Sequence, residues 1–242
     1  MECHSSTNSN LKSDKPSDRK SRLRQLLGNP HIWRPGSTPV RQGELLPTGF
    51  SALDGLLGGG WPPGVLTELL LEGQGIGELR LLMPAIKALQ LSGARGQRRS
   101  QSCWIAPPFI PYAPALARHG LDLTQLLIVS PAAARDALWA MEQALRAHTC
   151  ALVLCWADKV SQQATRRLQV AAEASGAHGF LLRPVRFARQ SSTAALRIRL
   201  SVTHKSTQQN RQPGDEPGST QHLQLELLRN RYGRPGRVSL SC

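Results

Sequence analysis

Residues 47–80 read PTGFSALDGLLGGGWPPGVLTELLLEGQGIGELR, and this stretch decides the fold of the 242-residue chain. A mainly apolar run, Val65–Leu71, is followed by a glycine-rich loop and then by a helical pattern that begins at Glu78. This order predicts a strand, a loop and a helix. In α/β proteins such an arrangement holds phosphate, because backbone N–H groups and the helix N-terminus point at the anion.

The loop keeps the spacing of a phosphate-binding loop but not its chemistry. A working loop reads GxxxxGK[ST], in which Lys reaches the β- and γ-phosphates and the hydroxyl holds Mg²⁺. Glu72 replaces the first glycine, Glu78 the lysine and Leu79 the Ser/Thr. The glycines that remain are Gly73, Gly75 and Gly77. We therefore predict a degenerate loop with no catalytic residues, no metal, no required cofactor and no ATP hydrolysis. Weak docking of a nucleotide is left open.

Two parts of the chain resemble known families. The pattern TG-x3-LD-x3-GGG-x-P from Thr48, followed by Glu68, resembles the N-terminal half of the RecA-type recombinase core. From Leu71 onward the chain is similar to the ImuA proteins of the bacterial SOS mutagenesis system and to the related SulA-type division inhibitors. The stretches DALWAMEQALRAHTCALVLCWADKV and TRRLQVAAEASGAHGFLLRP carry this likeness. The resemblance covers about residues 46–185.

The alternation of apolar runs and helical patterns predicts an α/β fold. We expect one RecA-like core, with a mostly parallel central sheet flanked by helices and an antiparallel edge from residues 195–229. The expected parallel strands are 65–71, 102–106, 126–129, 150–156 and 179–182, and the expected helices are 78–91, 135–147 and 161–175. Pro84 is expected to kink the first of these helices or to end its first turn. Residues 196–202 and 223–227 alternate with a two-residue period, which predicts an antiparallel pair.

The end of the strand 150–156 is where a RecA-type ATPase supplies a metal-binding acid. In this chain Trp156 stands at the tip, and Asp158 lies two residues beyond. We interpret Asp158 as a helix-capping or loop acid.

Composition predicts one domain with polar ends. The domain is expected over residues 46–242, with a basic tail at 229–242, after a disordered N-terminal segment, 1–45, that contains a short basic helix at 18–27. The sequence has no apolar run of 18 residues and no apolar N-terminal segment, so we expect a cytoplasmic protein without a membrane partner. The cysteines in apolar runs, Cys103, Cys150 and Cys155, are expected to be reduced core residues.

Positive charge gathers in the last third of the chain. The whole chain has a net charge of +14, and in residues 151–242 there are 14 Lys and Arg against 5 Asp and Glu. Such an excess suggests a polyanion or an acidic protein surface as partner, or else a merely solvated basic surface. The candidate contact residues in the tail are Arg229, Arg231, Tyr232, Arg234 and Arg237, and those on an exposed helix face are Arg166 and Arg167.

The tail segment 229–237 is expected to stay mobile until a partner orders it. Three interpretations are open: it lies on a DNA backbone with Tyr232 stacked on a base, it docks on a protein, or it has no function.

A chain without catalytic residues must act through its surfaces. By resemblance to ImuA, the leading hypothesis is a non-catalytic accessory protein of SOS-induced translesion DNA synthesis. The implied partners are a Y-family-like polymerase homologue of the ImuB type, an error-prone C-family polymerase, RecA and, in one interpretation, DNA. The alternative is a SulA-like inhibitor that binds the tubulin-like division protein FtsZ and blocks its polymerisation. A third candidate, a DNA-dependent recombinase ATPase, is disfavoured by the loop.

Overall fold

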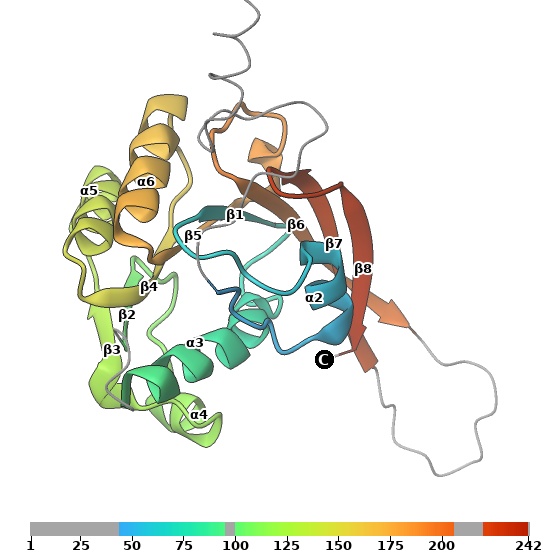
Figure 1. Cartoon of the computed structure of the whole chain (residues 1–242), viewed down its shortest axis with the longest axis horizontal. Helices are drawn as coiled ribbons and strands as arrows, with labels where there is room; N and C mark the ends of the chain where they lie inside the picture. The colour runs from blue at the N-terminus through green and yellow to red at the C-terminus, as the bar shows by residue number, and fades with distance from the viewer. Residues whose placement is uncertain (1–43, 95–99, 206–219, 242) are drawn as a thin grey trace, which may run out of the picture. The chain divides into compact units, whose positions relative to one another are not determined.

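The computed structural model describes residues 44–94, 100–205 and 220–241, which form a mixed α/β fold around one eight-stranded sheet (Figure 1). The strands are β1 (Leu66–Leu71), β2 (Gln101–Ile105), β3 (Leu126–Val129), β4 (Cys150–Trp156), β5 (His178–Pro184), β6 (Leu196–Lys205), β7 (Thr220–Asn230) and β8 (Gly236–Ser241). The helices are α2 (Ser51–Leu57), α3 (Glu78–Ala94), α4 (Ala113–Arg118), α5 (Ala134–Arg146) and α6 (Gln162–Ser175), with short 3₁₀ turns η1 (Leu123–Gln125) and η2 (Val185–Phe187). The predicted helix at 18–27 lies outside the described residues.

The strands are ordered β3-β2-β4-β5-β1-β6-β7-β8. Neighbours from β3 to β6 pair in parallel, and the pairs β6–β7 and β7–β8 are antiparallel. This arrangement confirms the predicted α/β class, with a mostly parallel sheet and an antiparallel edge. Every parallel connection carries a helix or a long crossover, as parallel pairing requires.

Each face of the sheet has its own apolar core, because strands buried on both faces send alternate side chains to opposite sides. In β4, Leu152 and Leu154 pack in the core that contains α2 and α3, whereas Val153 and Cys155 pack in the core under α5 and α6. Figure 1 shows α3 and the pair α5 and α6 on opposite sides of the sheet.

The three cysteines of the second core are buried and free, which confirms the prediction of reduced core residues. Burial raises the pKa of the Cys155 thiol to about 12. A hydrogen bond with the Cys150 side chain, and then burial, raise the pKa of Cys103. The Cys103 and Cys155 thiols therefore stay neutral near pH 7 and act as small packing groups.

The glycine-rich block before β1 is a tight corner. Leu46 and Trp61 form an antiparallel bridge, with Leu46 N–H donating to the Trp61 carbonyl at 2.9 Å. Gly60 has a φ of 137°, and a Cβ on it would lie 2.3 Å from the Leu46 carbonyl oxygen, so no other residue fits there. Asp54 accepts the backbone N–H of Thr48 at 2.8 Å and fixes the preceding turn.

Two helix expectations need correction. Helix α3 runs through Pro84 to Ala94, so of the two alternatives given for Pro84 the one in which it ends the first turn is wrong, and a kink stays a prediction. The second concerns helix α6: the helical period of residues 161–175 predicts that Gln169 faces outward with Arg166 and Arg167, and the structure differs. The Gln169 side chain is buried, and its Oε1 accepts the backbone N–H groups of Leu66 (3.2 Å) and Ala195 (3.1 Å). The amide satisfies two buried donors that the sheet leaves unpaired.

The prediction of a mobile tail at 229–237 is wrong. Strand β7 continues to Asn230, the chain turns, and β8 pairs with β7 from Gly236↔Leu227 to Ser241↔His222. The arginines and glycines of the segment 229–237 do not form a pattern that predicts a strand. The pairing is decided by Val238 and Leu240, which pack against the apolar core beside β7.

None of the described helices is long and apolar enough to cross a membrane.

Candidate functional site

The glycine-rich loop between β1 and α3 is closed by its own carboxylate. Gly75 N–H donates to Glu78 Oε1 at 3.0 Å, and the Glu78 side chain is buried. Its second oxygen, Oε2, has no hydrogen-bond partner in the described part of the chain. A loop of this kind presents N–H groups to an anion, and here a side-chain carboxylate already takes one of them.

The other predicted loop residues offer nothing to a triphosphate. The Glu72 carboxylate forms an ion pair with Arg199 Nη2 at 2.6 Å, and Leu79 packs partly against the apolar core. A Cβ on Gly77 would meet the Leu223 side chain, so this end of the loop lies tight against β7. The loop therefore lacks both the ammonium group and the hydroxyl that phosphoryl transfer uses.

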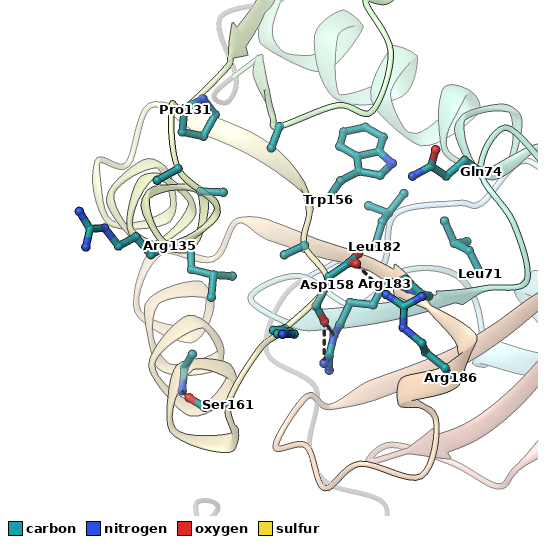
Figure 2. A pocket seen from close by; sticks show the side chains of 18 of the residues that line it. Leu71, Gln74, Pro131, Arg135, Trp156, Asp158, Ser161, Leu182, Arg183 and Arg186 are labelled. Carbon is teal, nitrogen blue, oxygen red and sulfur yellow. Dashed lines mark hydrogen bonds and ion pairs between the residues drawn. The ribbon is translucent and has the colours of Figure 1, made fainter.

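A groove of about 1060 Å³ lies beside the loop, at the carboxyl ends of β1, β4 and β5 and the first turns of α5 and α6 (Figure 2). We call it the carboxyl-end groove. Ligands of open α/β sheets bind at this edge, because loops with variable side chains meet there. The lining residues that matter below are Glu72, Arg135, Trp139, Trp156, Asp158 and Lys159.

The polar groups of the groove are mostly cationic. Asp158 Oδ2 accepts from Arg186 Nη2 at 2.7 Å, which makes Asp158 a loop acid, as interpreted from the sequence. Lys159 has no ion-pair partner among the described residues. The indole N–H of Trp156 is buried and has no acceptor in the described structure. In the described residues, no three His, Cys, Asp or Glu side chains are grouped so as to hold a metal ion.

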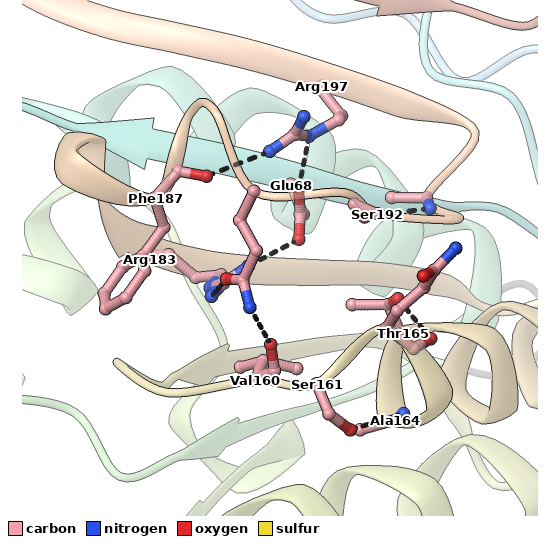
Figure 3. Close-up of polar contacts among 12 residues, drawn as sticks. Glu68, Val160, Ser161, Ala164, Thr165, Arg183, Phe187, Ser192 and Arg197 are labelled. Atoms are coloured by element: carbon pink, nitrogen blue, oxygen red, sulfur yellow. Dashed lines mark hydrogen bonds and ion pairs between the residues drawn. The ribbon is translucent and has the colours of Figure 1, made fainter.

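Beneath the groove lies a buried ion cluster that sequence reasoning missed (Figure 3). Glu68 of β1 accepts from Arg183 Nη1 of β5 at 3.0 Å and from Arg197 Nε of β6 at 2.6 Å. The side chains of Glu68 and Arg183 are fully buried, and that of Arg197 is 11% exposed. The alternation of side chains along each strand could have suggested that these charges lie side by side, but only if the order of the strands in the sheet had been known.

A second missed feature is an apolar loop between β2 and α4. Three of its side chains are exposed: Phe109 by 67%, Ile110 by 95% and Tyr112 by 70%. We call these three residues the apolar loop. The sequence predicts only a proline-rich crossing there. The sequence pattern that could have predicted this exposed loop is the alternation of prolines with large apolar residues. Prolines restrict the backbone, and this hinders the packing of such side chains onto the core.

The predicted contact arginines do not form one site. Arg229 donates to the Ser192 carbonyl, and Arg231 and Arg237 pair with Glu173 and Glu226. Two more of the predicted residues also make contacts within the domain. The Tyr232 side chain packs partly against the apolar core, and Arg167 forms an ion pair with Glu142. Arg166 and Arg234 are exposed. Most of these cations are therefore engaged within the domain, and they lie on separate elements.

The fold and the site define a class: an α/β domain with a glycine-rich loop closed by the Glu78 carboxylate, a cationic groove and an exposed apolar loop. The chain belongs to the SulA family. The family model "Cell division inhibitor SulA" matches residues 64–179.

Three relatives of this family show how far the likeness extends. Cell division inhibitor SulA of Citrobacter koseri is 30% identical over 124 residues, which cover 50% of this chain and 70% of that protein. SulA of Serratia marcescens is 28% identical over 123 residues, with 51% and 70% covered. SulA of Yersinia enterocolitica is 26% identical over 143 residues, with 58% and 82% covered.

These matches correct the leading functional hypothesis. The chain was expected to be an ImuA-type accessory protein of translesion synthesis, and its relatives are instead named cell division inhibitors. The expected contacts with polymerases and RecA rested on that role and lose their basis with it. Membership of an inhibitor family agrees with the expectation that the chain is not an enzyme.

Proposed function

We propose that this protein is an SOS-induced inhibitor of bacterial cell division that binds FtsZ and blocks its polymerisation. Membership of the SulA family supports a role in the inhibition of cell division. The observation that carries the mode of action is the apolar loop, Phe109, Ile110 and Tyr112, whose side chains are largely exposed. Large exposed apolar groups on one loop are typical of protein-binding surfaces.

The geometry of the loop suits a docking role. It leaves β2 after Ala106, a non-glycine residue with a φ of 53°, and it enters α4 with a proline in the first turn of that helix. A backbone restricted in this way loses less conformational entropy when it binds a partner. The aromatic side chains provide large contact areas with few rotatable bonds.

Inhibition by this surface can be tested on purified FtsZ. The variant Ile110→Asp places a charge in the centre of the apolar loop and is expected to weaken FtsZ binding by at least about 30-fold, the effect of losing a hot spot. Sedimentation of FtsZ polymers with GTP measures the inhibition. Val170→Asp is the control, because Val170 is an exposed apolar residue on α6. Full inhibition by Ile110→Asp, or no inhibition by the wild-type protein, would contradict the proposal.

We also infer that the domain is a RecA-like core that no longer hydrolyses ATP. The pattern from Thr48 and the strand order support this relation, and the Glu78 carboxylate on Gly75 N–H supports the loss of activity. We expect no Mg²⁺-dependent phosphate release from ATP by the wild-type protein. Phosphate release that Glu78→Ala abolishes would show that Glu78 acts in catalysis and would overturn this inference.

A further inference from the structure

We propose that the carboxyl-end groove binds an acidic, apolar-containing peptide segment of the protein partner. The inference rests on the proposed function and adds a second contact to the apolar loop. The chain segment that carries the apolar loop starts at the groove, because Ala106, directly after β2, is one of the residues that line it. A partner seated on the apolar loop can therefore reach the groove with a neighbouring segment.

Charge complementarity is the first support. The groove is lined by four arginines and Lys159, against only two carboxylates, Glu72 and Asp158. Both carboxylates are already paired with arginines, at 2.6 and 2.7 Å. Arg135 is 89% exposed, and its ion pair is with its chain neighbour Asp136 at 3.5 Å. Arg135 and Lys159 are thus the cations that are available to a ligand, and they attract carboxylates.

Apolar surface is the second support. Trp139 of α5 lines the groove and is 64% exposed, and Trp156 of β4 forms part of its floor. Figure 2 shows the Trp156 ring on the side of the groove near Gln74, with its indole N–H buried. A peptide that contains apolar side chains can cover the exposed indole of Trp139.

The same contacts disfavour a phosphate ligand. A nucleotide would use the backbone N–H groups of the loop 72–77, where Glu78 already binds Gly75 N–H. A peptide can instead place its acids beside Arg135 and Lys159 and an apolar residue between them.

The probe for this groove is a fluorescein-labelled decapeptide of alternating Asp and Leu, titrated with the full chain in low salt and followed by anisotropy. The double variant Arg135→Glu/Lys159→Glu is expected to weaken binding by more than about tenfold, since reversal turns attraction into repulsion. Trp139→Ala is expected to weaken it as well. The matched control is Arg166→Glu, which reverses an exposed arginine of α6 that does not line the groove.

Several outcomes would overturn the proposal. Equal affinity for an Asn/Leu peptide would show that charge is not recognised. An equal loss of peptide affinity in Arg166→Glu would show that the whole basic surface, and not the groove, attracts the peptide. Stronger competition by ATP or by a thymidine oligonucleotide than by unlabelled peptide would assign the groove to phosphate.

The link to the proposed function has its own readout. If the double variant binds the peptide poorly but inhibits FtsZ polymerisation as the wild type does, the assignment of the peptide to the partner is wrong. If the wild type binds the peptide through Arg135 and Lys159 but never inhibits FtsZ, the proposed function fails while the groove still binds acidic peptide.

Discussion

Glu68→Ala is expected to lower the free energy of unfolding by about 3–5 kcal/mol, because it leaves two arginines without their shared counter-charge in the sheet. Arg183 is fully buried and Arg197 nearly so, and both donate to the Glu68 carboxylate. Arg183 would keep only neutral acceptors, the Asp158 carbonyl and the Gln190 side chain. Urea unfolding followed by circular dichroism measures the effect.

The structure supplies a matched control on the same pair of elements. Glu72 follows β1 and pairs with Arg199 of β6 at 2.6 Å, the same distance that separates Glu68 from Arg197. The Glu72 pair is about 40% exposed on each side, at 39% and 44%. Solvent screens such a pair, so Glu72→Ala is expected to cost less than about 1 kcal/mol. Equal costs for the two variants would contradict the assignment of burial as the cause.

A triple variant separates the net value of the cluster from the cost of breaking it. Replacing Glu68, Arg183 and Arg197 together by apolar residues removes every charge of the cluster, and buried ion clusters replaced in this way are often neutral or stabilising. We therefore expect the triple variant to be more stable than Glu68→Ala. A triple variant as unstable as the single one would show that the cluster itself, and not the unpaired charge, sustains the sheet.

Removing the chain after Leu228 is expected to prevent stable folding. The deletion takes away β8 and the end of β7, including the buried Leu240, and it exposes the β7 edge with Leu223 and Leu225 behind it. Each buried leucine contributes about 1.5–3 kcal/mol, against a total stability of about 5–15 kcal/mol. An exposed apolar edge strand also favours aggregation. Solubility and the thermal melt of the truncated protein measure the effect.

Two point variants test the same strand without a deletion. Leu240→Asp buries a carboxylate in the apolar core, and we expect it to cost more than about 3 kcal/mol. Its neighbour Ser239 is exposed, so Ser239→Asp is expected to change the stability by less than about 0.5 kcal/mol. A soluble, cooperatively melting protein truncated after Leu228 would restore the interpretation of this segment as a dispensable tail.

The confusion between the ImuA and SulA resemblances has a physical cause. The stretches that carry both likenesses are the strand β4 and the inner faces of α5 and α6, which are nearly all buried. Buried positions are selected for packing volume and apolar character, so they report the fold more than the function. Binding residues lie more often on surface loops, which vary more in sequence than the elements they connect.

The sequence by itself determined the parallel part of the fold. The continuous apolar run 150–156 predicted a strand buried on both faces, since only helices on both sides of a sheet allow such a run, and β4 is such a strand. The replacement of lysine by Glu78 predicts a loop without phosphate chemistry, and this stays a prediction.

The tertiary structure alone decided which charges meet and which segments pair. Glu68, Arg183 and Arg197 lie far apart in sequence, and their contact depends on β1 lying between β5 and β6. The segment 236–241 has no strong strand pattern, and it becomes β8 because β7 offers an open edge next to the core. Which distant segments pair depends on the strand order of the whole sheet, and this order cannot be predicted from local periodicity.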